Sequence, residues 1–143
     1  MDKSRREVAT MIAMGGAGMA LSPAAEAVGK KGGAVGAPTL VHHVFFWLNN
    51  AGSQADRDAL IAGLWTLRAI PVIRNLQVGV PAPTEQRDVV DASYDVSELM
   101  YFNNAADQKI YQDHPIHQAF VAKCQHLWSK VVVYDMQVVP PAV

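Results

Sequence analysis

The feature that most constrains the fold is the segment Leu40–Leu48, which is apolar on both of its alternating faces. β-Branched and aromatic residues dominate the segment, Pro38 precedes it, and Asn49 and Gly52 follow it, so it is predicted to be a β-strand. The segment Val131–Val139 repeats this two-sided pattern. Because a strand that is apolar on both sides is normally covered on both sides, we expect a sheet that needs a covering layer on each face.

Two helices are predicted to supply one covering layer. Ser53 makes an N-cap for the first helix, whose apolar residues keep a helical spacing until Pro71 ends it. Asn104 begins the second helix, which Pro115 interrupts before the apolar stripe continues. Both helices are therefore expected to be amphipathic and to pack on the sheet.

The remaining apolar segments, Ile73–Val80 and Val89–Phe102, predict two further strands that form a hairpin. The resulting order, β-α-β-β-α-β, is that of an α+β ferredoxin-like domain with four antiparallel strands and both helices on one face. The other face is left bare in a single chain. We therefore expect a homodimer in which two sheets face each other and form an α/β barrel.

Composition narrows the class of protein further. The chain has 12 Lys and Arg against 13 Asp and Glu, so it lacks the positive field that nucleic acid requires, and no nucleic-acid partner is expected. Cys124 is the one cysteine, which excludes an internal disulfide framework, and no Cys/His spacing is typical of a structural zinc site. The apolar core must hold the fold by itself.

Residues 1–27 are predicted to be a signal peptide of the twin-arginine type. Arg5 and Arg6 precede the uncharged stretch Ala9–Leu21, and small residues around Ala27 suit cleavage. At about 1.5 Å per residue, this stretch is too short as a helix to cross a hydrocarbon core of about 30 Å, so no membrane span is expected. Residues 28–38, with four glycines, are predicted to be a flexible linker, and residues 39–140 the folded domain. The alternative is a frayed cytosolic N-terminus, but the three signals in order favour export to the periplasm or beyond a bacterial cell.

A His-Pro-x-His-x-x-Phe element occupies residues 114–120 and is followed by an apolar strand that reaches Asp135. Other short elements accompany it: Val41-His42-His43-Val44, Ile70-Pro71, Val78-Gly79 and Tyr101-Phe102. In these elements, over about residues 39–137, the chain resembles the stress-responsive dimeric α/β-barrel (Dabb) family. The resemblance implies a homodimeric barrel, in agreement with the two-sided apolar strands. Members of the family share a fold more than an activity.

The plant polyketide cyclases within this family imply a set of site residues. By resemblance, their catalytic histidine corresponds to His117 and its partner tyrosine to Tyr111. A pocket histidine on the first strand corresponds to His43, while another, on the third strand, falls at Val96, where the polar contact would be missing. The reaction implied for those enzymes is an intramolecular cyclisation.

The residues themselves allow acid–base chemistry. Tyr111, His114 and His117 are spaced around a proline-broken helix, so that with His43 they are expected to line one ligand pocket between helix and sheet. A neutral imidazole, with a pKa of about 6.5, can take a proton from a carbon next to a carbonyl group. His117 would be this base, and the Tyr111 hydroxyl would donate to the enolate oxygen. Such chemistry needs neither a metal nor an organic cofactor.

Structural interpretations compete with these roles. A histidine before proline, as at His114, commonly bonds to the backbone at a helix kink. His117 and His43 could equally be core histidines that bond to each other or to Tyr111. His42 lies on the opposite face of its strand from His43 and is expected at the dimer interface. No metal site is expected, because the nearby carboxylates lack ligand spacing.

Three functions therefore remain open. The first is the binding of a small apolar or aromatic molecule in the helix–sheet pocket. The second is a cofactor-independent cyclase, lyase or isomerase with His117 as base. The third is a structural, stress-protective module whose core is filled. An open cavity reaching His117 would favour the first two, and side chains that fill this space would favour the third.

Overall fold

The computed structural model describes residues 36–143. The expected signal peptide at 1–27 and residues 28–35 of the expected linker lie outside the described residues. Within residues 36–143, no helix has the length and apolar character needed to span a bilayer.

Four antiparallel strands form one sheet in the order β2-β3-β1-β4. The strands are β1 (Leu40–Leu48), β2 (Asn75–Gly79), β3 (Val96–Phe102) and β4 (Trp128–Gln137). The long two-sided strand β1 is central and pairs with β3 and β4, and β2 and β3 form the expected antiparallel pair. The ferredoxin-like α+β fold is therefore confirmed.

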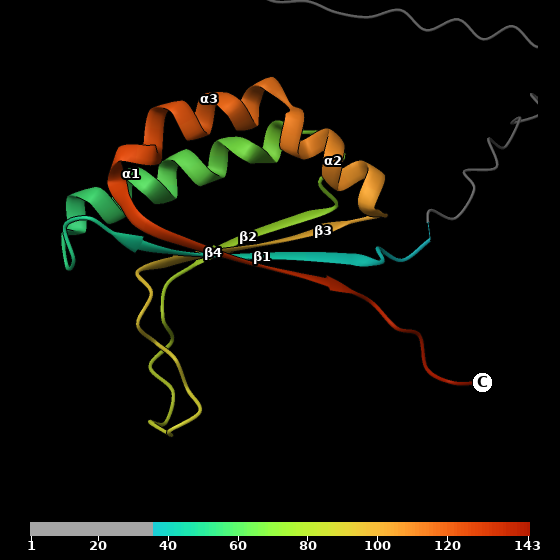
Figure 1. Cartoon of the computed structure of the whole chain (residues 1–143), viewed down its shortest axis with the longest axis horizontal. Helices are drawn as coiled ribbons and strands as arrows, with labels where there is room; N and C mark the ends of the chain where they lie inside the picture. Colours follow the sequence, from blue (N-terminus) through green and yellow to red (C-terminus); the bar gives the residue numbers. More distant parts are fainter. Residues whose placement is uncertain (1–35) are drawn as a thin grey trace, which may run out of the picture. The chain divides into compact units, whose positions relative to one another are not determined.

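The helices α1 (Gln54–Trp65), α2 (Ala105–Asp113) and α3 (Pro115–Cys124) all lie on one face of this sheet (Figure 1). Short 3₁₀ turns, η1 (Thr66–Ala69) and η2 (Gln125–Leu127), follow α1 and α3. The predicted caps are present, since the side chains of Ser53 and Asn104 accept hydrogen bonds from the backbone N–H groups of Asp56 and Asp107. Pro115 divides the second predicted helix into α2 and α3.

Two predicted strands are shorter than their apolar segments. The segment 80–95 between β2 and β3 is irregular and leaves the sheet on the side away from the helices (Figure 1). Pro81 and Pro83 cannot donate to a strand ladder, and Asp91 accepts a hydrogen bond from the Ser93 N–H, a local turn that competes with pairing.

A continuous apolar core fills the space between the helices and the sheet. α1 and α3 approach closely at Gly63, where an added Cβ would lie 2.5 Å from the sulfur of Cys124. The opposite face of the sheet carries aromatic side chains without a covering helix: Phe45, Tyr94 and Tyr134 form a cluster with ring centroids 4.9 and 5.9 Å apart. Tyr134 is 64% exposed, so this face is uncovered in a single chain, as expected.

Candidate functional site

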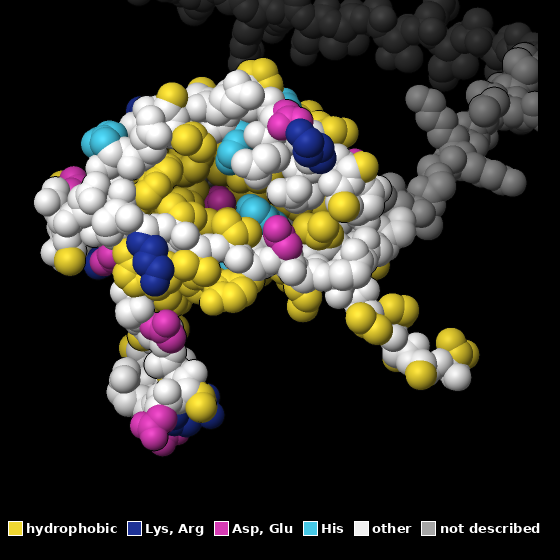
Figure 2. Space-filling view, in the orientation of Figure 1, with side chains coloured by type: hydrophobic (Ala, Val, Ile, Leu, Met, Phe, Trp, Pro, Cys, Tyr) yellow, Lys and Arg dark blue, Asp and Glu magenta, His cyan; other side chains and the backbone are white. Residues whose placement is uncertain are grey.

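A pocket of about 180 Å³ opens between the helices and the sheet, beside β4. Figure 2 shows a hollow there, surrounded by hydrophobic side chains, with histidine and acidic side chains visible within it. Strands β1, β3 and β4 and helices α2 and α3 all contribute to its wall. The lining residues are His42, Val44, Phe46, Glu98, Tyr111, Gln112, His117, Phe120, Val121, Trp128, Val131 and Val133.

His42, not His43, is the histidine of β1 that lines this pocket. His43 was expected in the pocket and His42 at the dimer interface, and both expectations are wrong. Val44 and Phe46 face the helices, and because side chains alternate along a strand, His42 faces the helices with them. His43 lies on the uncovered face against Phe45, with ring centroids 4.2 Å apart. Burial lowers the pKa of His43, and the neighbouring His42 lowers it further.

His42 is held in place by an acidic partner on β4. Its Nδ1 lies 2.6 Å from Oδ1 of Asp135, and the strand register places these two residues directly opposite each other. Since a carboxylate accepts, Nδ1 of His42 carries the hydrogen. The His42 side chain is 6% exposed, whereas the Asp135 side chain is about half exposed. The ring of His42 also packs edge-on against Tyr111, with centroids 5.6 Å apart.

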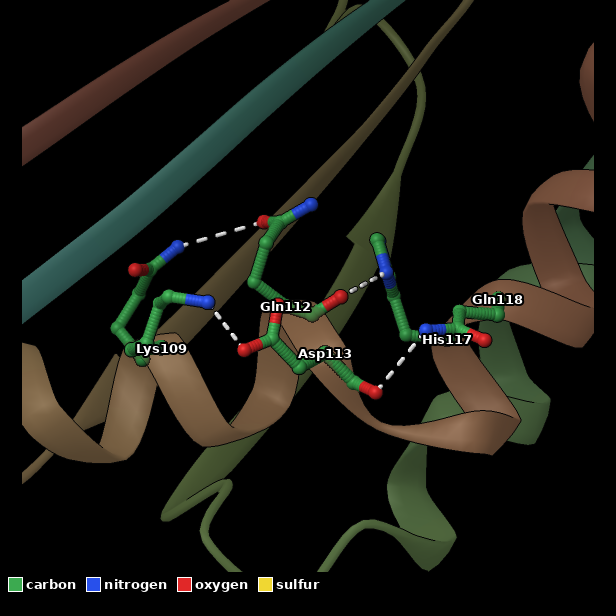
Figure 3. A network of polar contacts seen from close by, with 6 residues as sticks. Lys109, Gln112, Asp113, His117 and Gln118 are labelled. Carbon is green, nitrogen blue, oxygen red and sulfur yellow. Dashed lines mark hydrogen bonds and ion pairs between the residues drawn. The ribbon is translucent and has the colours of Figure 1, made fainter.

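His117 enters the pocket from the first turns of α3. Its Nδ1 lies 3.0 Å from the backbone carbonyl oxygen of Gln112, as Figure 3 shows. A carbonyl oxygen can only accept, so Nδ1 carries the hydrogen and Nε2 of the neutral ring keeps its lone pair. Burial lowers the pKa of His117; the bond to Gln112 raises it and His42 lowers it further. The imidazole is therefore neutral at pH 7.

Polar contacts fix the junction between α2 and α3 that positions His117. Lys109 pairs with the Asp113 carboxylate one turn later, and the Gln118 side chain donates to the Asp113 carbonyl oxygen over 3.2 Å (Figure 3). The bond from Gln118 satisfies a backbone carbonyl at the end of α2, where Pro115 breaks the helix. It joins the start of α3 to the end of α2.

Tyr111 lies beside His117, as the spacing predicts, with ring centroids 4.7 Å apart. The residue is 1% exposed. Burial raises the pKa of its hydroxyl, and the negative charge of a nearby Glu98 would raise it further. The hydroxyl is therefore protonated at neutral pH and can donate a hydrogen bond.

Neither His114 nor Val96 lines this pocket, although both positions were expected at it. His114 is the N-cap of α3, and its Nδ1 accepts the N–H of Ile116 over 3.1 Å, which confirms the structural interpretation. Val96 is fully buried in the core, opposite Phe46 in the strand register.

Glu98 is an acidic lining residue that the sequence analysis did not single out. It follows Val96 by two residues on β3 and so faces the helices, where it is 2% exposed. Its Oε2 atom has no hydrogen-bond partner in the described part of the chain. Burial raises the pKa of this carboxyl to about 8. The available signal was an acidic residue at an inward position of an apolar alternation, Val96, Met100 and Phe102.

The pocket therefore brings together a neutral imidazole, a protonated phenol, a buried carboxyl and a histidine–aspartate pair. Residues 36–143 contain no group of three or more His, Cys, Asp or Glu side chains placed to hold a metal ion. The arrangement can bind a small molecule through apolar walls and a few hydrogen bonds. It can also move a proton between Nε2 of His117 and a bound molecule.

The fold and this pocket define a class: a ferredoxin-like α+β domain with a ligand-sized pocket between its helices and its sheet. The chain belongs to the stress responsive A/B barrel domain (Dabb) family, whose pattern matches residues 40–138. None of the curated proteins is a significant sequence match to the chain.

Solved structures similar to this chain share its fold. A dimeric ferredoxin-like protein of unknown function from Thermobifida fusca is 22% identical with a TM-score of 0.57, over 71% of this chain and 92% of that chain. A Dabb family protein from Mesorhizobium loti is 23% identical with a TM-score of 0.57, over 74% and 100% of the two chains. A hydroxynitrile lyase from Passiflora edulis is 21% identical with a TM-score of 0.60, over 75% and 100%.

Proposed function

We propose that this Dabb domain binds one small apolar or aromatic molecule in the helix–sheet pocket. The observation that carries the proposal is the open volume of about 180 Å³ that reaches both His117 and Tyr111. An apolar cavity of about 150 Å³ is large enough to hold benzene, so this pocket suits a molecule with a single ring. Side chains do not fill the space, and His43 lies on the other face, which argues against a purely structural module.

The lining supports this ligand class. Seven of the lining residues are valines or largely apolar aromatic residues: Val44, Phe46, Phe120, Val121, Trp128, Val131 and Val133. Burying a ring against them is favourable by about 25 cal/mol per Å² of apolar surface, while the few polar groups orient the molecule.

Filling the pocket tests the proposal. Val133 lines the pocket and is 46% exposed, so Val133→Trp should occupy the opening without disturbing the core. Val139, 83% exposed and outside the lining, provides the control Val139→Trp. We expect cyclohexanone, added as a probe and followed by NMR titration, to bind the wild-type chain and the control but not Val133→Trp. Equal binding by all three proteins would contradict the proposal, and mass spectrometry of the native protein would reveal a co-purified ligand.

The second candidate function is a cofactor-independent lyase, cyclase or isomerase. It is favoured by the tautomer of His117, whose free Nε2 is the lone pair that a general base needs. In this reaction, Nε2 takes a proton from the carbon beside a carbonyl group, and the Tyr111 hydroxyl donates to the oxygen of the resulting enolate. A hydroxynitrile lyase among the structures of this fold supports lyase chemistry as a candidate.

Proton exchange measures this base directly. The α-hydrogens of cyclohexanone exchange with deuterated water when a base removes them, and NMR follows the loss of signal. We expect His117→Ala to slow the protein-dependent exchange about 10²-fold or more while probe affinity stays within a few fold. His126→Ala, at an exposed histidine outside the pocket, is the matched control. Unchanged exchange in His117→Ala would exclude this residue as the base.

We further propose that the functional unit is a homodimer. The uncovered face of the sheet carries Phe45, Trp47 and Tyr134, which in a single chain line a hollow open to water. Covering this face with the same face of a second copy would remove that apolar surface from water. The dimeric ferredoxin-like protein from Thermobifida fusca supports this arrangement.

Export is the remaining proposal, and it rests on Arg5, Arg6 and the apolar stretch that follows. Replacing both arginines by lysine should keep the protein in the cytoplasm of its bacterial host, whereas the wild-type chain is exported. Export of the double-lysine variant at the wild-type level would contradict the twin-arginine route.

A further inference from the structure

Glu98 is a buried acid that the fold itself does not require. Its neighbours across the sheet are Val44 on β1 and Val78 on β2, so the strand pairing gives the carboxyl no polar partner. The side chain is 2% exposed, and Oε2 forms no hydrogen bond within residues 36–143. Leaving a buried polar atom unpaired is costly, so such an atom in a native pocket calls for a partner from outside the chain.

The surroundings of the carboxyl decide which partner fits. Glu98 lines the pocket together with His42 on β1, Tyr111 on α2 and His117 on α3, and the lining contains no Lys or Arg. Without a cation, burial raises the pKa of Glu98 to about 8, so the group is a neutral carboxylic acid at pH 7. A neutral acid offers one O–H donor, and Tyr111, which lines the same pocket, offers its phenol as a second donor.

We propose that Glu98 is a recognition residue that selects ring-sized ligands bearing a neutral hydrogen-bond acceptor, such as a ketone oxygen, over apolar and charged molecules of the same size. This inference rests on the proposed function, since it assigns the ligand class of the same pocket. The acid donates to the ligand oxygen, and Tyr111 is positioned to donate to it as well. An apolar ligand would leave Oε2 unpaired, and an anion would lose its hydration in a pocket whose lining contains no Lys or Arg.

Two ligands of nearly identical shape separate recognition from simple filling of the pocket. Cyclohexanone and methylenecyclohexane differ only in whether oxygen or CH₂ is double-bonded to the ring, and cyclohexylammonium tests for a cation. We expect the wild-type full chain to bind cyclohexanone about tenfold more tightly than methylenecyclohexane in NMR titrations at pH 7. Cyclohexylammonium should bind more weakly than cyclohexanone.

Variants of Glu98 assign this preference to the carboxyl. Glu98→Gln keeps a donor and should retain the preference within about threefold, whereas Glu98→Leu should bind the two neutral ligands equally well. Glu98→Ala replaces Glu98→Leu if the latter does not fold. Equal binding of the two ligands by wild type, a preference kept in Glu98→Leu or Glu98→Ala, or tighter binding of cyclohexylammonium would overturn the inference and leave the proposed function standing. Failure of wild type to bind either neutral ligand would overturn both.

Discussion

At the scale of single residues, the pocket uses burial to keep two different groups uncharged. Burial raises the pKa of the Glu98 carboxyl to about 8 and lowers the pKa of the His117 imidazole. Burial disfavours the charged form of each group, which moves an acid and a base in opposite directions. The result at pH 7 is an acid that can donate a proton and a base that can accept one, within the same cavity.

The raised pKa of Glu98 makes a prediction about stability. Between pH 4.5 and about 8 the unfolded carboxyl loses its proton while the folded one keeps it, so the contribution of this group to stability falls as pH rises through this window. We expect Glu98→Gln to have a higher free energy of unfolding than wild type. This gain should be greater at pH 8 than at pH 5 by on the order of 1–3 kcal/mol. Urea denaturation of both proteins at both pH values measures this difference.

Because each comparison is between variant and wild type at one pH, the titration of groups common to both proteins largely cancels. A Glu98→Gln effect that is equal at pH 5 and pH 8 would show that the carboxyl is not held in its protonated form.

At the scale of elements, the packing of α1 against α3 depends on the missing side chain of Gly63. In a helix interior, glycine to alanine normally gains about 1 kcal/mol. Here a Cβ would lie 2.5 Å from Sγ of Cys124 and 3.3 Å from the ring of Phe120. We expect Gly63→Ala to destabilise the fold by about 1–3 kcal/mol in spite of its helix propensity.

The double variant Gly63→Ala/Cys124→Ala identifies the cause. Removing the sulfur relieves the closest contact, so the two substitutions together should cost less than the sum of their separate effects in chemical denaturation. Strict additivity would mean that the contact between these two positions does not limit the approach of α1 and α3.

The helices were more predictable from sequence than the faces of the strands. Ser53, Asn104 and Pro115 act on the adjacent backbone, so their signals fix where helices begin and break whatever the rest of the molecule does. In β1 both alternating sets are apolar, and the pattern therefore does not say which set faces the helices. Only the long-range pairing of His42 with Asp135 and the burial of Val44 resolve it.

In the pocket, too, residues placed by local helix structure were predictable from the sequence, and residues placed by strand pairing were not. Tyr111 and His117 lie close together in sequence around a helix break, so spacing alone placed them side by side. Glu98 reaches the pocket, and Asp135 reaches His42, from strands far away in sequence, where position depends on register. No local pattern specifies that register.

At the scale of the whole molecule, the uncovered aromatic face predicts the state of assembly. We expect the wild-type chain to sediment as two copies at micromolar concentration, and Tyr134→Asp to shift it towards one, since a charge at that position would be buried between the sheets. Ile110→Asp is the control, because Ile110 is similarly exposed, at 52%, but lies on α2 on the helical side. A single-chain mass for wild type in analytical ultracentrifugation would contradict the homodimer.

Strand β4 pairs with β1 alone, so its outer row of N–H and C=O groups meets solvent. The same strand supplies Val131 and Val133, 38% and 46% exposed, to the wall of the pocket. The opening of the pocket therefore lies at the unpaired edge of the sheet. A chain that pairs with this edge would also narrow or complete the opening. Because coupling between two binding events is reciprocal, a molecule bound in the pocket would favour or oppose that pairing to the same extent.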